Sequence, residues 1–191
     1  MPDNSAVIAQ VCTTLAENGP DAAEQILRHE YPFAPQASAK RTYGPAQAVP
    51  VFVRDGFIDR YSGARLVFPP VLHIIHVSCP DAFPHHPAWR TDATHPAFNE
   101  LAATIDHLVP ITLGGADHES NWVTTSMARN FAKSNFSLEQ LGWELRPPGS
   151  FQIWDGLLRW YISYVTPRPI LRRSSTIGRW FKSATNALAS G

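Results

Sequence analysis

The sequence contains only two cysteines, Cys12 and Cys79, among its 191 residues. Two cysteines so far apart do not form a disulfide framework, cannot supply a four-cysteine zinc site, and are typical of a reducing compartment. No basic start followed by an apolar run marks a signal peptide, and Arg159 interrupts the longest candidate membrane segment, residues 157–165. We therefore expect a cytoplasmic protein without a membrane segment.

Net charge is also lacking, because 16 basic residues balance 16 acidic ones. The total charge therefore gives no argument for a polyanionic partner, and nucleic-acid binding has to be argued from local charge. An apolar fraction of 44% is normal for a globular protein, and the chain is long enough to bury a sizeable core.

The pattern of apolar residues predicts an α+β fold that begins with a helical region over residues 1–50. Helical spacing predicts a first helix over residues 4–18, which Asn18-Gly19-Pro20 ends, and a second short helix follows. Residues 31–50 are expected to form an irregular linker. The β-prone run at residues 51–58 predicts a strand or hairpin that opens a core extending to residue 146.

Within this core, the Pro- and His-rich residues 69–99 are expected to form an insertion, a long ordered loop with short helical pieces. The following residues predict a strand at 104–111, a Gly-Gly turn, a second strand at 122–125 and a helix at 126–135. After a break at 146–149, a C-terminal part over residues 147–191 should contain a helix at 151–165. Its apolar residues are expected to pack on the core through Ile153, Leu157, Trp160 and Tyr164.

Four residues of the strand–turn–strand–helix segment have the chemistry that phosphodiester hydrolysis requires. A neutral histidine, His107, can take a proton from water near neutral pH. Asp106 and the side-chain carbonyl of Asn130 are oxygen ligands suited to a hard divalent ion, which acts as a Lewis acid. Lys133 lies one helical turn after Asn130, so both are expected on the same helix face.

The pattern Asp106-His107-x-x-Pro, Gly114-Gly115, Asn121, Asn130-x-x-Lys133 resembles the HNH endonucleases, whose site is a ββα-metal hairpin and helix. The resemblance covers residues 51–146 and is strongest over residues 104–135. The intervals of fourteen residues from His107 to Asn121 and nine from Asn121 to Asn130 are also similar to the HNH domain of RNA-guided DNA nucleases.

The resemblance implies a role for each motif residue. Asp106 and Asn130 are the implied ligands of one Mg²⁺ or Mn²⁺ ion, and His107 is the implied general base. Asn121 is the implied brace of the hairpin loop, which orients the base, and Lys133 is the implied cation near the phosphate. The implied substrate is nucleic acid, with double-stranded DNA expected first.

The zinc-binding Cys-x-x-Cys pairs that brace many HNH hairpins are missing from this sequence. Asp59 and Ser62 stand in place of the first pair, and Ser126 and Arg129 in place of the second. We therefore expect no structural zinc, and we hypothesise an ion pair between Asp59 and Arg129 in its place. Simple solvation of both side chains is the alternative.

The remaining candidates are histidines and basic residues outside the motif. His73-x-x-His76-x-x-Cys79 has a spacing that a metal site can use, although histidines of a Pro-rich loop are the preferred interpretation. His118 is expected to cap or to be solvated rather than to catalyse. The nucleic-acid contacts are assigned to Arg129, Lys133, Arg172, Arg173 and Arg179, with docking of the C-terminal segment on the core as the alternative.

The sequence thus predicts a metal-dependent endonuclease in which His107 activates water and one divalent ion stabilises the transition state. Two alternatives are a catalytically inactive nucleic-acid-binding module on the same scaffold and a protein-interaction domain with an exposed apolar patch near the C-terminus.

Overall fold

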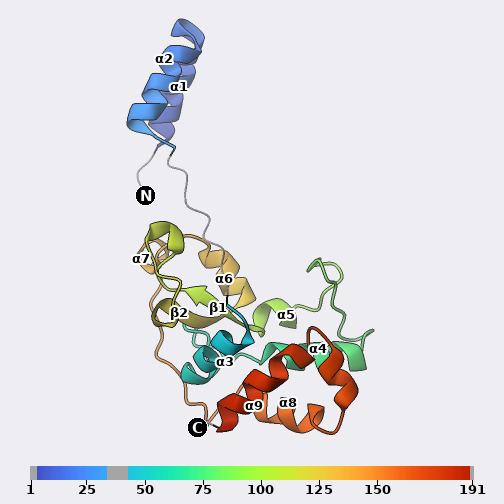
Figure 1. Cartoon of the computed structure of the whole chain (residues 1–191). Coiled ribbons are helices and arrows are strands. Elements are labelled where there is room, and N and C mark those ends of the chain that lie inside the picture. The colour runs from blue at the N-terminus through green and yellow to red at the C-terminus, as the bar shows by residue number, and fades with distance from the viewer. Residues whose placement is uncertain (1–3, 34–42, 190–191) are drawn as a thin grey trace. The chain divides into compact units, whose positions relative to one another are not determined.

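A computed structural model describes residues 4–33 and 43–189 of the chain (Figure 1). The chain divides into two compact units, residues 1–38 and 39–191. The first unit is a pair of contacting helices, α1 (Ser5–Asn18) and α2 (Pro20–Glu30), separated by Gly19 with a φ of 85°. Both predicted helices of this region are confirmed, and Pro20 begins the second because its fixed φ suits a first helical turn.

Helix α3 (Pro45–Arg54) lies where the sequence predicted the end of the linker and the start of a strand. Over these residues the prediction is wrong, whereas residues 34–42 of the predicted linker lie outside the described residues. Ala48, Val49, Val51 and Phe52 are all buried, and their spacing is that of one helix face. Pro50 lies inside this helix, and its presence disguised the helical pattern in the sequence. The β-prone residues of this run therefore form the inner face of a helix.

The Pro- and His-rich segment is more regular than predicted. Helix α4 (Pro69–Ser78) occupies its first third and buries Val71, Leu72 and Ile74, and the short helix α5 (Ala97–Glu100) closes it. The residues between them form turns and irregular backbone. Tandem prolines start α4 because the first turn of a helix tolerates a missing N–H.

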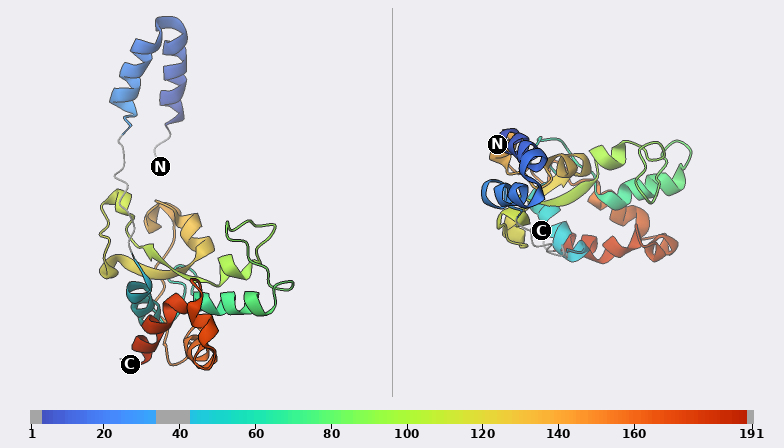
Figure 2. Two further views of the ribbon diagram at one scale, coloured as in Figure 1. Left: turned by 45° about the vertical axis from the view of Figure 1, so that its right-hand side comes forward. Right: turned by 90° about the horizontal axis from the view of Figure 1, so that it is seen from above.

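The centre of the unit is a strand–strand–helix segment in the predicted order. Strand β1 (Ala103–His107) pairs antiparallel with strand β2 (Trp122–Ser126), and they form the one sheet of the described residues. Ser126 then caps helix α6 (Met127–Lys133), its hydroxyl accepting a hydrogen bond from the Arg129 N–H. The hairpin contacts α3 and α6 (Figures 1 and 2).

Short elements complete the loop of the hairpin and the segment after α6. The loop contains the 3₁₀ turns η1 (Ile111–Leu113) and η2 (Glu119–Asn121), and helix α7 (Leu138–Leu141) follows α6. The described residues are thus mostly helical, with one two-stranded antiparallel hairpin, in an α+β arrangement.

The C-terminal part packs on the same core. Helix α8 (Leu158–Val165) contacts α4 and α9, as Figure 2 shows, and it is followed by η3 (Pro169–Arg173), η4 (Gly178–Trp180) and helix α9 (Phe181–Ala189). The predicted inward face is confirmed for Leu157 and Tyr164, which pack half-buried against the core, and is wrong for Ile153 and Trp160. Leu158, Tyr161 and Val165 are buried, whereas Ile153 is 75% exposed and Trp160 40% exposed.

None of the helices within residues 4–33 and 43–189 combines the length and apolar character needed to cross a bilayer.

Candidate functional site

Asp106 and His107 form the end of strand β1, where the register pairs them with Val123 and Trp122. Successive strand side chains point to opposite faces of a sheet, so the two side chains meet different partners. Both residues are only 3% exposed. Each buried polar group therefore requires hydrogen bonds from the protein, and these bonds define the site.

The Asp106 carboxylate is held by Tyr61 and Lys133. Its Oδ2 accepts a hydrogen bond from the Tyr61 hydroxyl at 2.7 Å and lies 3.1 Å from the Lys133 ammonium. The same ammonium donates to the carbonyl oxygen of His107 at 2.7 Å. Burial, followed by the charge of Asp106, raises the pKa of Tyr61, so that this hydroxyl stays protonated and acts as a donor.

Lys133 is fully buried, at 0% exposure, and this corrects its expected role as a cation that faces a phosphate from the helix surface. Its side chain points inward to the end of β1, because a buried ammonium requires both a counter-charge and acceptors. The motif lysine therefore joins α6 to the hairpin in this structure.

Asn130 also ties α6 to strand β1. Its amide Nδ2 donates to the carbonyl oxygen of Ile105 at 3.0 Å, and the residue is half-buried. Among the described residues, the hydrogen bonds of Asn130 and Asp106 leave Oδ1 of each residue unused. A carboxylate oxygen and an amide oxygen on neighbouring elements fit the donor chemistry of Mg²⁺ or Mn²⁺ in a site completed by water and phosphate. Within the described ranges, no group of three or more His, Cys, Asp and Glu residues forms a closed metal cage.

His107 meets a carboxylate that the sequence did not single out. Its Nε2 lies 2.8 Å from Oδ1 of Asp117, a residue of the hairpin loop. The indole N–H of Trp122 lies 3.0 Å from the same nitrogen and 3.2 Å from the same carboxylate oxygen. The sequence offered one signal, an acidic residue ten positions after the histidine, but nothing in it shows that this loop folds back.

The donors and acceptors of this trio allow two histidine tautomers. An indole N–H only donates, and an ionised carboxylate only accepts. A proton on Nε2 can donate to Asp117 and leaves the lone pair of a neutral imidazole on Nδ1, whereas an unprotonated Nε2 can accept the indole N–H of Trp122. The first tautomer is the one in which Nδ1 can act as a general base.

Asn121 braces the hairpin loop in the position that the motif implies. Its Oδ1 accepts from the Val109 N–H at 2.9 Å, and its Nδ2 donates to the carbonyl oxygens of Val109 and Ala116. The loop approaches so closely that a Cβ at Gly115 would lie 1.9 Å from the Val109 oxygen. The brace therefore requires glycine at this position and fixes the loop on either side of Asp117.

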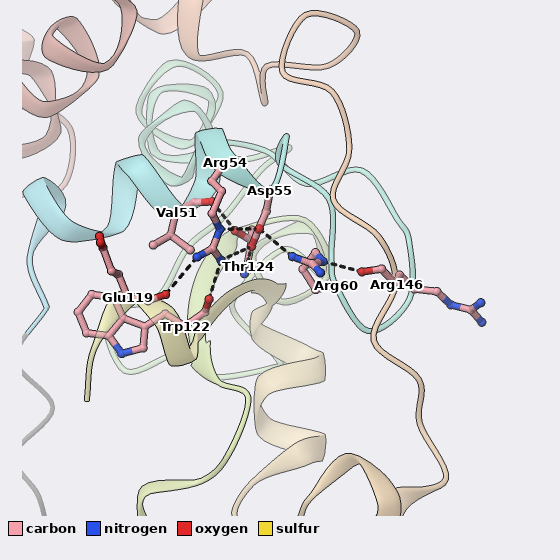
Figure 3. Close-up of polar contacts among 8 residues, drawn as sticks. All are labelled: Val51, Arg54, Asp55, Arg60, Glu119, Trp122, Thr124 and Arg146. Carbon is pink, nitrogen blue, oxygen red and sulfur yellow. Dashed lines mark hydrogen bonds and ion pairs between the residues drawn. The ribbon is translucent and has the colours of Figure 1, made fainter. Parts of the chain in front are cut away.

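A buried polar network, drawn in Figure 3, anchors the hairpin to helix α3. Its centre is Asp55, which is 0% exposed and accepts from Arg54, from Arg60 and from the Thr124 N–H of strand β2. Arg54 also donates to the carbonyl oxygens of Glu119 and Trp122. These bonds hold both ends of the segment that carries Trp122, the indole partner of His107.

A second buried carboxylate, Asp59, binds the end of strand β2 by hydrogen bonds, and the expected ion pair with Arg129 is wrong. Asp59 is 1% exposed, and it accepts from the N–H groups of Tyr61, Ser62 and Ser126 and from the Thr125 hydroxyl at 2.9–3.2 Å. Those four donors satisfy the carboxylate without a cation. The exposed Arg129 instead places its guanidinium over the Trp143 ring, at 5.3 Å.

The candidates outside the motif do not form a metal site. His73, His76 and Cys79 follow one another on or just after α4, and Cys79 is exposed. Desolvation, followed by the neighbouring His85 and His76, lowers the pKa of His73 to about 4. His118 caps η2 by accepting from the Ser120 N–H, so its predicted capping role is confirmed.

The C-terminal arginines lie on folded backbone rather than on a free tail. Arg172 is exposed, but its guanidinium donates to the Thr166 carbonyl oxygen at 2.6 Å and lies over the Phe181 ring. Arg173 is exposed, and Arg179 is exposed with its guanidinium 5.4 Å from the Trp180 ring. Ile177 and Ala184 are buried in the core, which confirms the docking of this segment on the core.

No protein-family model, no curated protein and no solved structure matches this chain.

Proposed function

We propose that this chain is a metal-dependent endonuclease of the HNH type, which hydrolyses phosphodiester bonds in DNA. The supporting observation is that the hairpin β1–β2, its loop and helix α6 gather Asp106, His107, Asn121, Asn130 and Lys133 within one segment. The resemblance of the motif predicted these five residues to act together.

In this proposal, His107 removes the proton from the attacking water at Nδ1. Asp117 holds the opposite ring nitrogen at 2.8 Å and stabilises the imidazolium that forms. The histidine is only 3% exposed, so the hairpin loop has to open before water and a phosphate reach it. Opening of a catalytic loop around a substrate is a common step in enzymes.

Asp106 and Asn130 would hold the divalent ion through the oxygen atoms that their internal hydrogen bonds do not use. The bound ion supplies Lewis-acid stabilisation of charge on the phosphoryl oxygens and on the leaving oxygen. Lys133 keeps the other Asp106 oxygen in place at 3.1 Å and fixes the end of strand β1 through the His107 carbonyl oxygen. Such internal bonds replace the bracing that zinc gives other members of the proposed family.

The proposal is tested with purified protein on supercoiled plasmid DNA in Mg²⁺, Mn²⁺ or EDTA. Conversion to nicked or linear DNA in either metal, with none in EDTA, is the expected outcome. A parallel incubation with single-stranded DNA and RNA establishes the substrate class. Absence of conversion in both metals, with binding of the plasmid retained, would contradict the proposed activity.

A second candidate is a nucleic-acid-binding module without turnover, and one observation favours it. The Asp106 charge is already compensated by the buried Lys133 ammonium, and this lowers the attraction of the site for a divalent ion. Isothermal titration with Mn²⁺ separates the candidates. An endonuclease is expected to bind about one Mn²⁺ ion per chain, and Asp106→Ala should abolish this binding. A non-catalytic module is expected to bind no ion at this site.

A further inference from the structure

Beside the proposed site lies a hollow with aromatic walls, which we call the aromatic hollow. Its volume is about 170 Å³. It is lined by residues of α3, α4, α5, α6, β1, η4 and neighbouring loops, chiefly Tyr43, His73, Trp89, Phe98, Arg179 and Trp180. The pockets that hold drug-sized ligands have volumes of roughly 300–1,000 Å³, so this hollow suits a single small ring system.

The aromatic hollow adjoins the proposed catalytic segment. A second hollow, of about 340 Å³, shares Tyr43, Thr104 and Met127 with it and reaches Asn130. Thr104 lies two residues before Asp106 on strand β1, so both side chains are on the same face of the hairpin. The concave surface therefore leads from Asn130, one of the two proposed metal ligands, to the aromatic walls.

The chemistry of the walls suits a nucleobase. Trp and Tyr rings offer stacking faces to any base, while the exposed Arg179, 5.4 Å from the Trp180 ring, adds a positive charge for an adjoining phosphate. The low pKa of His73, about 4, leaves its imidazole neutral near pH 7. A neutral imidazole can donate or accept one hydrogen bond at the edge of a base.

Trp89 provides an independent observation. Its φ is 54°, in the left-handed region, where a bulky side chain is a genuine outlier. The turn is closed by the hydrogen bond from its N–H to the His86 carbonyl oxygen at 2.8 Å. This strained turn leaves the indole 37% exposed while it lines the hollow. Strain of this kind concentrates at ligand-binding positions.

We propose that the aromatic hollow binds one unpaired nucleobase of the strand that is cut, close to the scissile phosphate. The proposal rests on the proposed nuclease function, which it deepens by naming a single-stranded or flipped-out base as part of the substrate. Enzymes pay the cost of unstacking a base when a pocket of this type receives it. The base then anchors the strand while its phosphate lies at the hairpin.

The test measures binding without cleavage. Full-length protein in EDTA is titrated into a short single-stranded DNA with one 2-aminopurine, whose fluorescence reports stacking, and into the same strand with an abasic site in that place. We expect quenching on binding and roughly tenfold weaker binding of the abasic strand, equivalent to about 1.4 kcal/mol. Equal affinity for the two strands would overturn the proposal.

Two tryptophans of similar exposure provide a matched pair of variants. Trp89→Ala should abolish the quenching and weaken binding of the intact strand roughly tenfold. Trp160→Ala should change neither, because Trp160 is 40% exposed, stacks on Tyr164 at 4.9 Å and does not line the hollow. Equal effects of the two substitutions would overturn the proposal.

The plasmid assay separates this proposal from the proposed function. Cleavage without Trp89-dependent quenching would support the proposed nuclease and overturn the base pocket. Quenching that Trp89→Ala abolishes, without cleavage, would support the base pocket and overturn the proposed nuclease. If the aromatic hollow receives a side chain of a protein partner instead of a base, no DNA will show quenching. That result overturns the pocket proposal.

Discussion

The Lys133 ammonium lies 3.1 Å from the Asp106 carboxylate and 2.7 Å from the carbonyl oxygen of the adjacent His107. One buried cation therefore holds both residues that the motif assigns to chemistry. Taking two charges out of water costs free energy, which the pair recovers only through good geometry and additional hydrogen bonds. The Tyr61 hydroxyl supplies such a bond to Asp106 at 2.7 Å.

Removal of Lys133 should destabilise the protein strongly. Lys133→Met leaves the buried Asp106 without a counter-charge, and breaking a buried ion pair in this way costs about 3–5 kcal/mol. The double variant Lys133→Met, Asp106→Asn should recover much of the loss, because no unpaired charge remains. Urea unfolding followed by circular dichroism measures both. A Lys133→Met variant within about 0.5 kcal/mol of wild type would contradict the described pair.

Asp117→Asn should slow DNA cleavage by at least about tenfold while leaving the fold intact, since it removes the charge that stabilises a protonated His107. Glu119→Gln is the matched control, because this loop residue contributes only its carbonyl oxygen to the Arg54 network. Initial rates on plasmid DNA provide the comparison. Equal rates in the two variants would remove Asp117 from the mechanism.

Asp59→Ala should destabilise the protein by at least about 3 kcal/mol, because hydrogen bonds to charged groups contribute about 1.5–3 kcal/mol each and Asp59 accepts four. Arg129→Ala should cost about 1 kcal/mol or less, the value of an exposed cation–π contact. Chemical denaturation of the two variants is the measurement. Similar losses of stability in both variants would contradict the hydrogen-bond partners described for Asp59 and favour an ion pair between Asp59 and Arg129.

Stability should fall between about pH 6.5 and pH 4 because of His73. The pKa of this histidine is lowered from 6.5 to about 4 in the folded protein, so the unfolded chain binds the extra proton in this range. Its contribution is complete above pH 6.5 and is lost as the pH decreases toward 4. For a half-buried group, the loss is on the order of 1–2 kcal/mol after solvent screening.

Comparison with His73→Gln tests this origin of the acid sensitivity. The difference in unfolding free energy between pH 7 and pH 4.5 should be smaller in the variant than in wild type. An unchanged difference would assign the acid sensitivity to other groups, such as His85, whose pKa is lowered in the same direction by burial and by His76.

The sequence predicted the hairpin and its helix because their signals are local. Val123, Thr124 and Thr125 are β-prone, and Ser126 caps the helix that follows. It failed at α3, where Val51 and Phe52 have the side chains of a strand but the spacing of a helix. Residues with both properties are assigned by the tertiary packing, which a local pattern does not contain.

The site was predicted only as far as the motif extends. Asn121 forms the expected loop brace, but the partners of Asp59 and the inward position of Lys133 depend on contacts between residues far apart in the chain. Asp117 was missed because only the folded loop brings it to His107. Motif spacing predicted which residues lie close together, and packing specifies what each one contacts.

The ratio of plasmid-cleavage rates between wild type and His107→Ala in Mn²⁺ tests the central claim most directly. Loss of a general base typically lowers the rate by about 10²–10⁴-fold. We predict a loss of this size, with the near-ultraviolet circular dichroism and urea midpoint showing that the variant is folded. A folded His107→Ala protein that cleaves at the wild-type rate would contradict the account.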